Sequence, residues 1–172
     1  MLYWSEILGA SVYRNDKNIG NVENLMLHPE EKIIAGFLLE RRNRDIRYRY
    51  FPYSQIETMK RDRIDLKGSM ELKTLTKADG KQYMFCEDFL KKTIQDDKGE
   101  WIGRVADFGF DPSNGFVRDM IFSGSFVEDM WIGRKRMPVL YQVEFSREFI
   151  TIDKETREEI TGLNKGLRQW LK

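Results

Sequence analysis

Apolar and polar residues follow the same order in two stretches of the chain, residues 18–29 and residues 101–112. Each stretch reads Ile-Gly-x-Val, then two apolar residues one position apart, then a polar residue and Pro. The offset between the copies is constant, because 103 minus 20 and 112 minus 29 both give 83. A constant offset of this kind indicates an internal duplication, so we expect two small units that share a core or pack together.

The apolar positions change phase inside each copy. Val22 and Leu25 are an odd number of positions apart, so they cannot lie on one face of a regular strand, and Val105 and Phe108 repeat this step. A β-bulge would restore the phase. We therefore predict a bulged strand at the same place in both halves. The glycine of each Ile-Gly-x-Val is expected to mark a turn or a close approach of two backbones.

Further strands are predicted on both sides of each copy. A largely apolar run is typical of a strand buried on both faces, and turn residues before it predict a hairpin. In the first half, the beginning of the first strand, the turn, the apolar strand and the closing strands are expected at residues 7–13, 30–32, 33–40, 53–56 and 64–66. In the second half the corresponding ranges are 85–90, 111–115, 116–122, 139–143 and 149–152.

The remaining segments set the expected domain boundaries. Residues 68–85 are polar and contain two glycines, which is typical of a linker between a first unit at 1–67 and a second at 86–153. In residues 154–172 apolar side chains recur at helical spacings, which predicts a short amphipathic helix. These side chains are Ile160, Leu163, Leu167, Trp170 and Leu171. The expected fold class is therefore all-β with a short C-terminal helix.

Composition narrows the functional classes. With 29 Lys and Arg against 28 Asp and Glu, the chain has no global field to attract nucleic acid or an anionic membrane, so such a partner would need a local patch. Cys86 is the single cysteine and His28 the single histidine, which removes the usual zinc and copper ligand sets and fits a reducing compartment. No stretch approaches the roughly 18 consecutive apolar residues of a membrane span. We expect a cytoplasmic location, no integral membrane segment and no cofactor.

The repeated order of short strands, Ile-Gly-x-Val, hairpin, apolar strand, Pro and closing Ile pair resembles the PRC-barrel family. The resemblance covers residues 5–67 and 86–153, and its motifs are Gly20 with Val22, Gly103 with Val105, and the turn at 111–115. It implies two tandem small PRC-like β-barrels, related to the barrels of the photosynthetic reaction centre H subunit and of a ribosome maturation factor. Because the family consists of binding or assembly modules without shared catalytic residues, the resemblance implies a binding role. The first unit departs from the pattern at its turn, where His28 and Lys32 stand in place of Asp111 and Gly115.

The strongest candidate for a binding site is the basic and aromatic stretch at residues 41–50. Arginine supplies phosphate contacts and tyrosine a stacking face for an exposed base, so this stretch could bind RNA or the ribosome. Alternation is first a burial signal, however, and the other interpretation has the tyrosines inside the barrel and the arginines on a solvated face. The second unit has a basic run at the equivalent place. The candidate residues are Arg41, Arg42, Arg44, Arg47 and Arg49, with Arg134, Lys135 and Arg136.

Other candidate chemistry is sparse. The carboxylates of Asp107, Asp111 and Asp119 could in principle hold a hard cation, but they lack the dense ligand spacing of a calcium site, and Asp111 is explained by its turn. His28 is interpreted as a turn residue, and Cys86 as a small apolar side chain that packs. The sequence carries no nucleophile elbow, phosphate-binding glycine loop or dinucleotide fingerprint, and small barrels are filled by side chains. We expect no enzymatic activity.

Large aromatic residues are more numerous than a barrel of about 65 residues must bury, so some are expected between the units or between chains. The loop at residues 123–131 is a second candidate binding surface through Phe126 and Trp131, and its alternative role is to cap its own barrel. The function predicted is an adaptor or assembly module that docks a protein partner through the barrel surface. The alternative is a ribosome- or RNA-associated factor, and the aromatic surplus also allows a homodimer.

Overall fold

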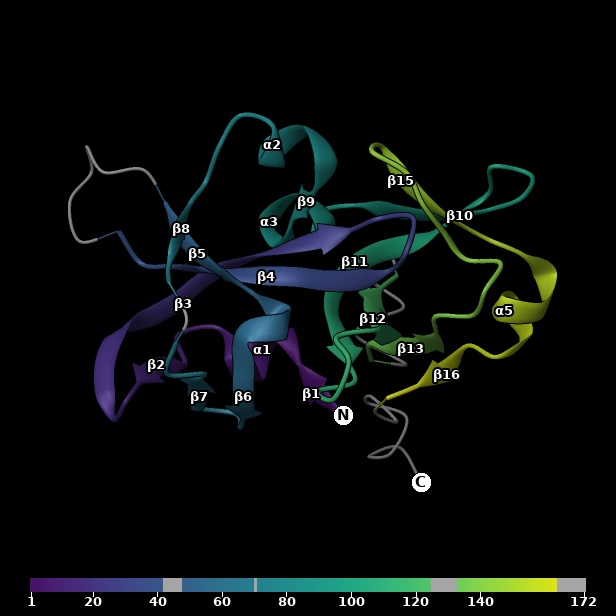
Figure 1. The fold of residues 1–172 in the computed structure, drawn as a ribbon. Helices are drawn as coiled ribbons and strands as arrows, with labels where there is room; N and C mark the ends of the chain where they lie inside the picture. The colour runs from purple at the N-terminus through teal and green to yellow at the C-terminus, as the bar shows by residue number, and fades with distance from the viewer. Residues whose placement is uncertain (42–47, 70, 125–132, 164–172) are drawn as a thin grey trace, which may run out of the picture.

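The computed structural model describes residues 1–41, 48–69, 71–124 and 133–163. Two β-sheets make up most of the molecule, and each is built largely from one half of the chain (Figure 1). The strand order is β6-β7-β2-β3-β4-β5-β8 in one sheet and β14-β15-β10-β11-β12-β13-β16 in the other. Strands at equivalent places in the sequence occupy equivalent places in the sheets. The expected all-β fold of two tandem units is thus confirmed.

The elements of the first half are β1 (Leu2–Tyr3), α1 (Trp4–Ile7), β2 (Ser11–Arg14), β3 (Lys17–His28), β4 (Ile33–Leu39), β5 (Arg49–Pro52), the 3₁₀ turn η1 (Tyr53–Gln55), β6 (Ile56–Met59), β7 (Arg63–Leu66) and β8 (Lys73–Thr74). Between the halves lie α2 (Asp79–Gln82) and β9 (Met84–Phe85). The second half has α3 (Cys86–Phe89), β10 (Thr93–Asp96), β11 (Trp101–Phe110), β12 (Val117–Ser123), β13 (Lys135–Pro138), β14 (Glu144–Phe145), β15 (Phe149–Ile152), α5 (Lys154–Glu158) and β16 (Thr161–Gly162).

The predicted bulge is present in both long strands. In β3, Val22 pairs with Leu39 and Asn24 with Leu38, so one extra residue lies between the two pairs. The pairing of β11 with β12 shifts at the equivalent place, between Val105 and Asp107. The extra residue lets apolar side chains on both sides of the bulge face the core, which is what the phase change in the sequence requires.

The two Ile-Gly-x-Val glycines are needed for different reasons. A Cβ on Gly103 would lie 2.5 Å from the carbonyl oxygen of Ser123 and 2.6 Å from the ring of Phe122. Gly20 has more space but a φ of +145°, a backbone conformation that L side chains rarely adopt. One glycine thus permits a close approach of two strands, and the other permits an unusual backbone angle.

The two halves exchange their amino-terminal segments. The short strand β1 pairs with β11 of the second half, and β9 pairs with β3 of the first half. The helices that follow are held by equivalent bulge residues. Asp107 accepts hydrogen bonds from the backbone N–H groups of Ser5 (3.2 Å) and Phe108 (2.8 Å), and its other oxygen accepts from the Ser5 hydroxyl at 2.6 Å. Asn24 likewise accepts from the N–H groups of Cys86 and Leu25.

An approximate two-fold axis relates the two halves. Ile33 and Phe116 are equivalent residues, because 116 minus 33 is 83, and they form a β-bridge with each other. The hydrogen bonds beside this bridge are reciprocal: the Ile34 N–H donates to the Gly115 carbonyl and the Val117 N–H to the Lys32 carbonyl, both at 2.9 Å. The bridge therefore lies on the axis.

A single hydrophobic core extends through both halves. The ring of Phe37 lies 6.5 Å from the ring of Phe110, centroid to centroid, and both side chains are fully buried. On the side of the second half, Phe89 from α3 stacks edge-on against Phe108 at 5.2 Å. The two units therefore pack as one body around shared apolar side chains, one of the two arrangements expected from the duplication.

Three details differ from the sequence-based expectations. Residues 7–13 do not begin with a strand, because Trp4 and Ile7 bury one side of α1 and β2 begins only at Ser11. The segment 68–85, expected to be a linker, contributes β8, α2 and β9, and two of these pair with the first sheet. The C-terminal helix is shorter than expected, because α5 ends at Glu158 and Thr161 already belongs to β16, which pairs with β13. Its expected apolar positions Leu167, Trp170 and Leu171 lie outside the described residues.

Candidate functional site

The basic stretch of the first unit is partly engaged within the protein. The guanidinium group of Arg41 lies 4.2 Å from the centre of the Tyr48 ring, and the Tyr48 hydroxyl donates to Glu23 at 3.3 Å. The stacking face expected to receive a base is thus covered on one side by an arginine of the same segment. Arg49 begins β5 and is partly buried. Arg42, Arg44 and Arg47 lie outside the described residues.

The basic run of the second unit is also partly engaged within the protein. Arg136 forms an ion pair of 2.6 Å with Asp119, whose side chain is only 7% exposed, while Arg134 is exposed. Lys135 is partly buried in β13. An arginine that neutralises a buried carboxylate is not free to bind phosphate, because removing it would leave that charge unpaired. RNA binding therefore stays a prediction. Phe126 and Trp131 lie outside the described residues.

The three candidate carboxylates of the second unit have separate roles. Asp107 holds α1, Asp119 pairs with Arg136, and Asp111 accepts from the N–H and hydroxyl of Ser113 at 2.9 and 2.6 Å. These hydrogen bonds lower the pKa of Asp111, although burial opposes the effect. Within the described residues, no group of three His, Cys, Asp or Glu side chains is placed to hold a metal ion.

The thiol and the imidazole are structural. Cys86 is buried at the start of α3, and burial raises the pKa of its thiol far above the ordinary value, with Asp107 and Glu87 adding to the effect. It is the free, protonated thiol that was expected to pack as an apolar side chain. His28 Nδ1 accepts a hydrogen bond from the Glu31 N–H at 3.4 Å, across the turn between β3 and β4. His28 therefore acts as the turn residue that the sequence indicated.

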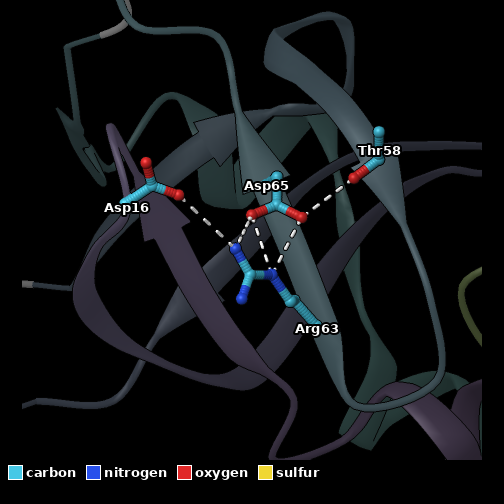
Figure 2. Close-up of polar contacts among 4 residues, drawn as sticks. All are labelled: Asp16, Thr58, Arg63 and Asp65. Atoms are coloured by element: carbon cyan, nitrogen blue, oxygen red, sulfur yellow. Dashed lines mark hydrogen bonds and ion pairs between the residues drawn. The ribbon is translucent and has the colours of Figure 1, made fainter.

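One polar cluster of the first unit was not foreseen. Figure 2 shows Arg63 and Asp65, two residues apart on β7, joined by hydrogen bonds of 2.7 to 3.0 Å, with Thr58 donating to Asp65 and Asp16 at 3.9 Å from Arg63. The guanidinium group also lies 4.1 Å from the centre of the Tyr13 ring. These hydrogen bonds, first that from Arg63, lower the pKa of Asp65. Because its donors and acceptors are paired with one another, we regard this cluster as a brace across β2, β6 and β7.

A groove between the two units is a further concave site. One part, of about 620 Å³, is lined by residues 29–30, 80–84, 88, 91–92, 145 and 147–148. A second part, of about 590 Å³, is lined by residues 29–30, 32 and 141–145. The two parts share the lining residues Pro29, Glu30 and Phe145, and we call them together the inter-unit groove. Sequence reasoning missed it because its walls come from three segments, residues 29–32, 80–92 and 141–148, that are distant from one another in the sequence.

The groove lies beside the two-fold axis, at a place where the halves differ. On one side of the axis Tyr53 fills the space over Gly115, and its hydroxyl donates to the Pro112 carbonyl at 3.0 Å. On the other side the equivalent pair is Val139 and Lys32. Lys32 Nζ donates across the units to the carbonyls of Leu140 (3.2 Å) and Tyr141 (2.6 Å), and burial lowers its pKa. The contact of Tyr53 on one side of the axis thus corresponds, on the other side, to the hydrogen bonds that Lys32 donates at the edge of the groove.

The side chains that line this groove include one that is almost fully exposed and one that is buried. Tyr141 is 95% exposed, whereas Lys92, which also lines the groove, is only 5% exposed. Lys92 Nζ donates a hydrogen bond to the carbonyl of Arg147, and burial lowers its pKa against the opposing effect of Asp88 and Glu148. The three acidic side chains of the larger part of the groove, Glu30, Asp88 and Glu148, are exposed.

Comparison with protein families settles the nature of the first unit. The family model of the PRC-barrel domain matches residues 1–73. Residues 1–73 are thus similar to the PRC-barrel domain. The resemblance stated from the Ile-Gly-x-Val motif is confirmed for this unit, and the match ends at residue 73, the first residue of β8. A search of curated proteins returned no match.

The second unit is similar to this PRC-barrel domain in its structure. It repeats the strand order, the parallel pair and the bulge of residues 1–73. The inter-unit groove is formed where the PRC-barrel domain, through residues 29–32, meets residues 141–148 of the second unit. Among the described helices, none is long and apolar enough to cross a membrane.

Proposed function

We propose that this protein is a non-enzymatic adaptor or assembly module of the cytoplasm, which docks a protein partner at the inter-unit groove. A PRC-barrel domain is typical of interaction and assembly modules, and residues 1–73 are similar to one. The free Cys86 is consistent with a reducing compartment. Adaptor function requires a surface that remains available after the units have packed together.

The inter-unit groove is the observation that carries this proposal. It is lined by residues of both units, and one of these, Tyr141, is almost fully exposed. Tyrosine is enriched at the centres of protein interfaces, because one ring buries a large area at a small cost in conformational entropy. A tyrosine that projects beside a groove can therefore serve as an anchor for a partner.

The non-enzymatic part of the proposal rests on the state of the most reactive side chains. The Cys86 thiol is buried with a raised pKa, and the His28 imidazole accepts a hydrogen bond inside its own turn. A nucleophile needs an accessible, activated atom next to a base. Neither side chain meets this requirement.

The proposal can be tested with a photo-crosslinking amino acid placed at Tyr141 in the full chain. The matched control carries the same amino acid at Asp16, whose side chain is fully exposed on the first unit, away from the groove. We expect one protein to be crosslinked in cells from position 141 and not from position 16. Equal crosslinking from both positions, or none from position 141, would refute docking at the groove.

A further inference from the structure

The turn η1 of the first unit is held by a lysine of its own unit. The Ser54 carbonyl accepts a hydrogen bond from Lys67 Nζ at 2.7 Å, and the Gln55 carbonyl accepts one from the Lys67 N–H at 3.0 Å. Lys67 directly follows β7, which belongs to the same sheet. Both donors to this turn therefore come from the first unit.

The second unit has a different residue at the place of Lys67. The offset between the closing segments is 86, because 138 minus 52 gives 86 for the two prolines, so the equivalent of Lys67 is Asp153. The Asp153 side chain accepts a hydrogen bond from the Thr156 N–H at 2.9 Å at the start of α5. An ionised carboxylate only accepts hydrogen bonds, so this side chain cannot hold the carbonyls of a turn as Lys67 does.

Lys32 of the first unit takes over that task. By the same offset, the carbonyls of Leu140 and Tyr141 are the equivalents of the two carbonyls that Lys67 holds. Lys32 Nζ donates to both of them, at 3.2 Å and 2.6 Å. A turn of the second unit is thus held by a side chain of the first unit, and both Lys32 and Tyr141 line the inter-unit groove.

The backbone angle of Lys32 favours glycine. Its φ is +55°, and the equivalent residue of the second unit, Gly115, has a φ of +78°. Residues with a Cβ are uncommon at positive φ, whereas glycine adopts such angles without strain. An unfavourable backbone angle at a residue whose side chain makes a specific contact points to a role for that side chain.

These contacts fix the main chain of Tyr141 and leave its ring available. The centre of the ring lies 5.6 Å from Lys32 Nζ, and the residue is nevertheless almost fully exposed. Two positions further on, Val143 is fully buried, and its N–H donates to the Leu140 carbonyl at 3.2 Å. A ring on a fixed turn loses less conformational entropy on binding than a ring on a turn that moves.

We propose that Lys32 is a positioning residue, which holds the turn at residues 140–143 and thereby presents the Tyr141 ring to a protein partner at the inter-unit groove. This inference rests on the proposed function and names the residue that controls its anchor. The first unit contributes to docking through a side chain that acts on the partner only by way of Tyr141.

Amide hydrogen exchange on the full chain tests whether Lys32 holds the turn. Lys32→Gly removes the side chain and relieves the backbone, and Lys32→Met removes only the charged group. In both variants we expect the Val143 amide to exchange at least about tenfold faster, because loss of a hydrogen bond from a charged donor favours local opening. Lys67→Met is the matched control, since it removes the equivalent bond in the first unit and should leave the exchange of Val143 unchanged.

Photo-crosslinking from position 141 tests the positioning role. The crosslinking amino acid keeps the main-chain carbonyl that Lys32 binds, so the same variants can be compared in cells. We expect the yield of the crosslinked protein to fall at least about twofold in Lys32→Gly and Lys32→Met, because only the closed fraction of the turn presents the anchor. Lys32→Arg retains a charged donor and should keep most of the yield, and Lys67→Met should not change it.

The thermal midpoint separates positioning from stability. Because glycine relieves the backbone angle, the midpoint of Lys32→Gly should be no lower than that of Lys67→Met, although its crosslinking yield falls. The inference is overturned if Val143 exchanges no faster in Lys32→Gly than in Lys67→Met. Equal crosslinking yields in the wild type and the Lys32 variants would also overturn it, and would leave the adaptor role intact. Absence of a crosslinked protein from position 141 in the wild type refutes the proposed function, and the positioning role with it.

Discussion

Replacement of Asp107 by Ala tests the exchange of segments between the two halves. The Asp107 carboxylate is 7% exposed and accepts three hydrogen bonds, from the Ser5 N–H, the Ser5 hydroxyl and the Phe108 N–H. Each hydrogen bond to a charged group contributes about 1.5–3 kcal/mol, and bonds to one carboxylate are not additive. We therefore expect Asp107→Ala to lower the free energy of unfolding by about 2–4 kcal/mol.

Asp107→Asn separates loss of hydrogen bonds from loss of charge. Asn24 performs the equivalent task in the first unit with an amide oxygen that accepts from the Cys86 N–H at 3.1 Å and the Leu25 N–H at 2.8 Å. An amide at position 107 can do the same, so we expect Asp107→Asn to cost only about 1 kcal/mol.

Urea unfolding followed by circular dichroism measures both variants. With an m-value of about 2 kcal/mol/M, a loss of 3 kcal/mol lowers the midpoint by about 1.5 M. Asp97→Ala is the matched control, because Asp97 is exposed in the turn between β10 and β11 and a surface substitution should stay within about 0.5 kcal/mol. The reasoning fails if Asp107→Ala is no less stable than Asp97→Ala.

A double-mutant cycle assigns the effect to the contact between the halves. Ser5→Ala removes only the hydroxyl donor, and we expect it to cost about 1 kcal/mol. In the double variant Ser5→Ala with Asp107→Ala, the hydroxyl bond is already lost, so the combined cost should be smaller than the sum of the single costs. Strict additivity would show that the Ser5 hydroxyl and Asp107 do not stabilise each other.

Four further predictions concern single residues. Thr156 is fully buried, and its hydroxyl has no hydrogen-bond partner among the described residues. Thr156→Val should therefore raise the free energy of unfolding by about 1 kcal/mol, and a lower thermal midpoint would contradict this. Gly103→Ala should lower the free energy of unfolding by more than about 3 kcal/mol, because the new Cβ would lie 2.5 Å from a backbone oxygen. Gly80→Ala is the control and should not destabilise the protein in this way, because the nearest atom to its Cβ would be 4.0 Å away. The pKa of Asp65 is lowered in the folded state. Its stabilising contribution is therefore present above the ordinary carboxyl pKa of about 4 and is lost as pH falls through the pKa of the folded state. Asp65→Asn should make the free energy of unfolding, measured against pH, fall less steeply in acid. The affinity of the protein for RNA over a salt series should be no better than that of an unrelated neutral protein. If RNA does bind, and if replacing Arg44, Arg47 and Arg49 together with Ala abolishes that binding, the result would support the alternative function.

The phase of the apolar residues was the most informative feature of the sequence. The odd spacing of Val22 and Leu25 predicted the bulge in β3, since a regular strand with a period of two cannot place both side chains on the same face. The repeated motif also predicted the equivalent strand β11. These features are local, and burial alone determines them.

Features that depend on contacts between the halves could not be predicted in this way. α1 is one turn long, so its two buried side chains, Trp4 and Ile7, are too few to show a helical period. β1 and β9 have two residues each, and their partners lie more than fifty positions away. A lysine is ordinarily exposed, so nothing in the sequence indicated that Lys92 is buried and donates to the Arg147 carbonyl. The candidate arginines gave no sign of their acidic partners for the same reason.

The bridge between Ile33 and Phe116 has a consequence for how the two halves can vary. In an assembly of two identical chains around this axis, every substitution would appear twice, so a bulky residue introduced on one side would meet the same residue on the other. Here both partners belong to one polypeptide, and each side is encoded separately. The contact of Tyr53 with Gly115 on one side and the hydrogen bond from Lys32 to the Leu140 carbonyl on the other could not coexist in a symmetric dimer. Covalent fusion thus allows each side of the axis to hold the halves together through different contacts.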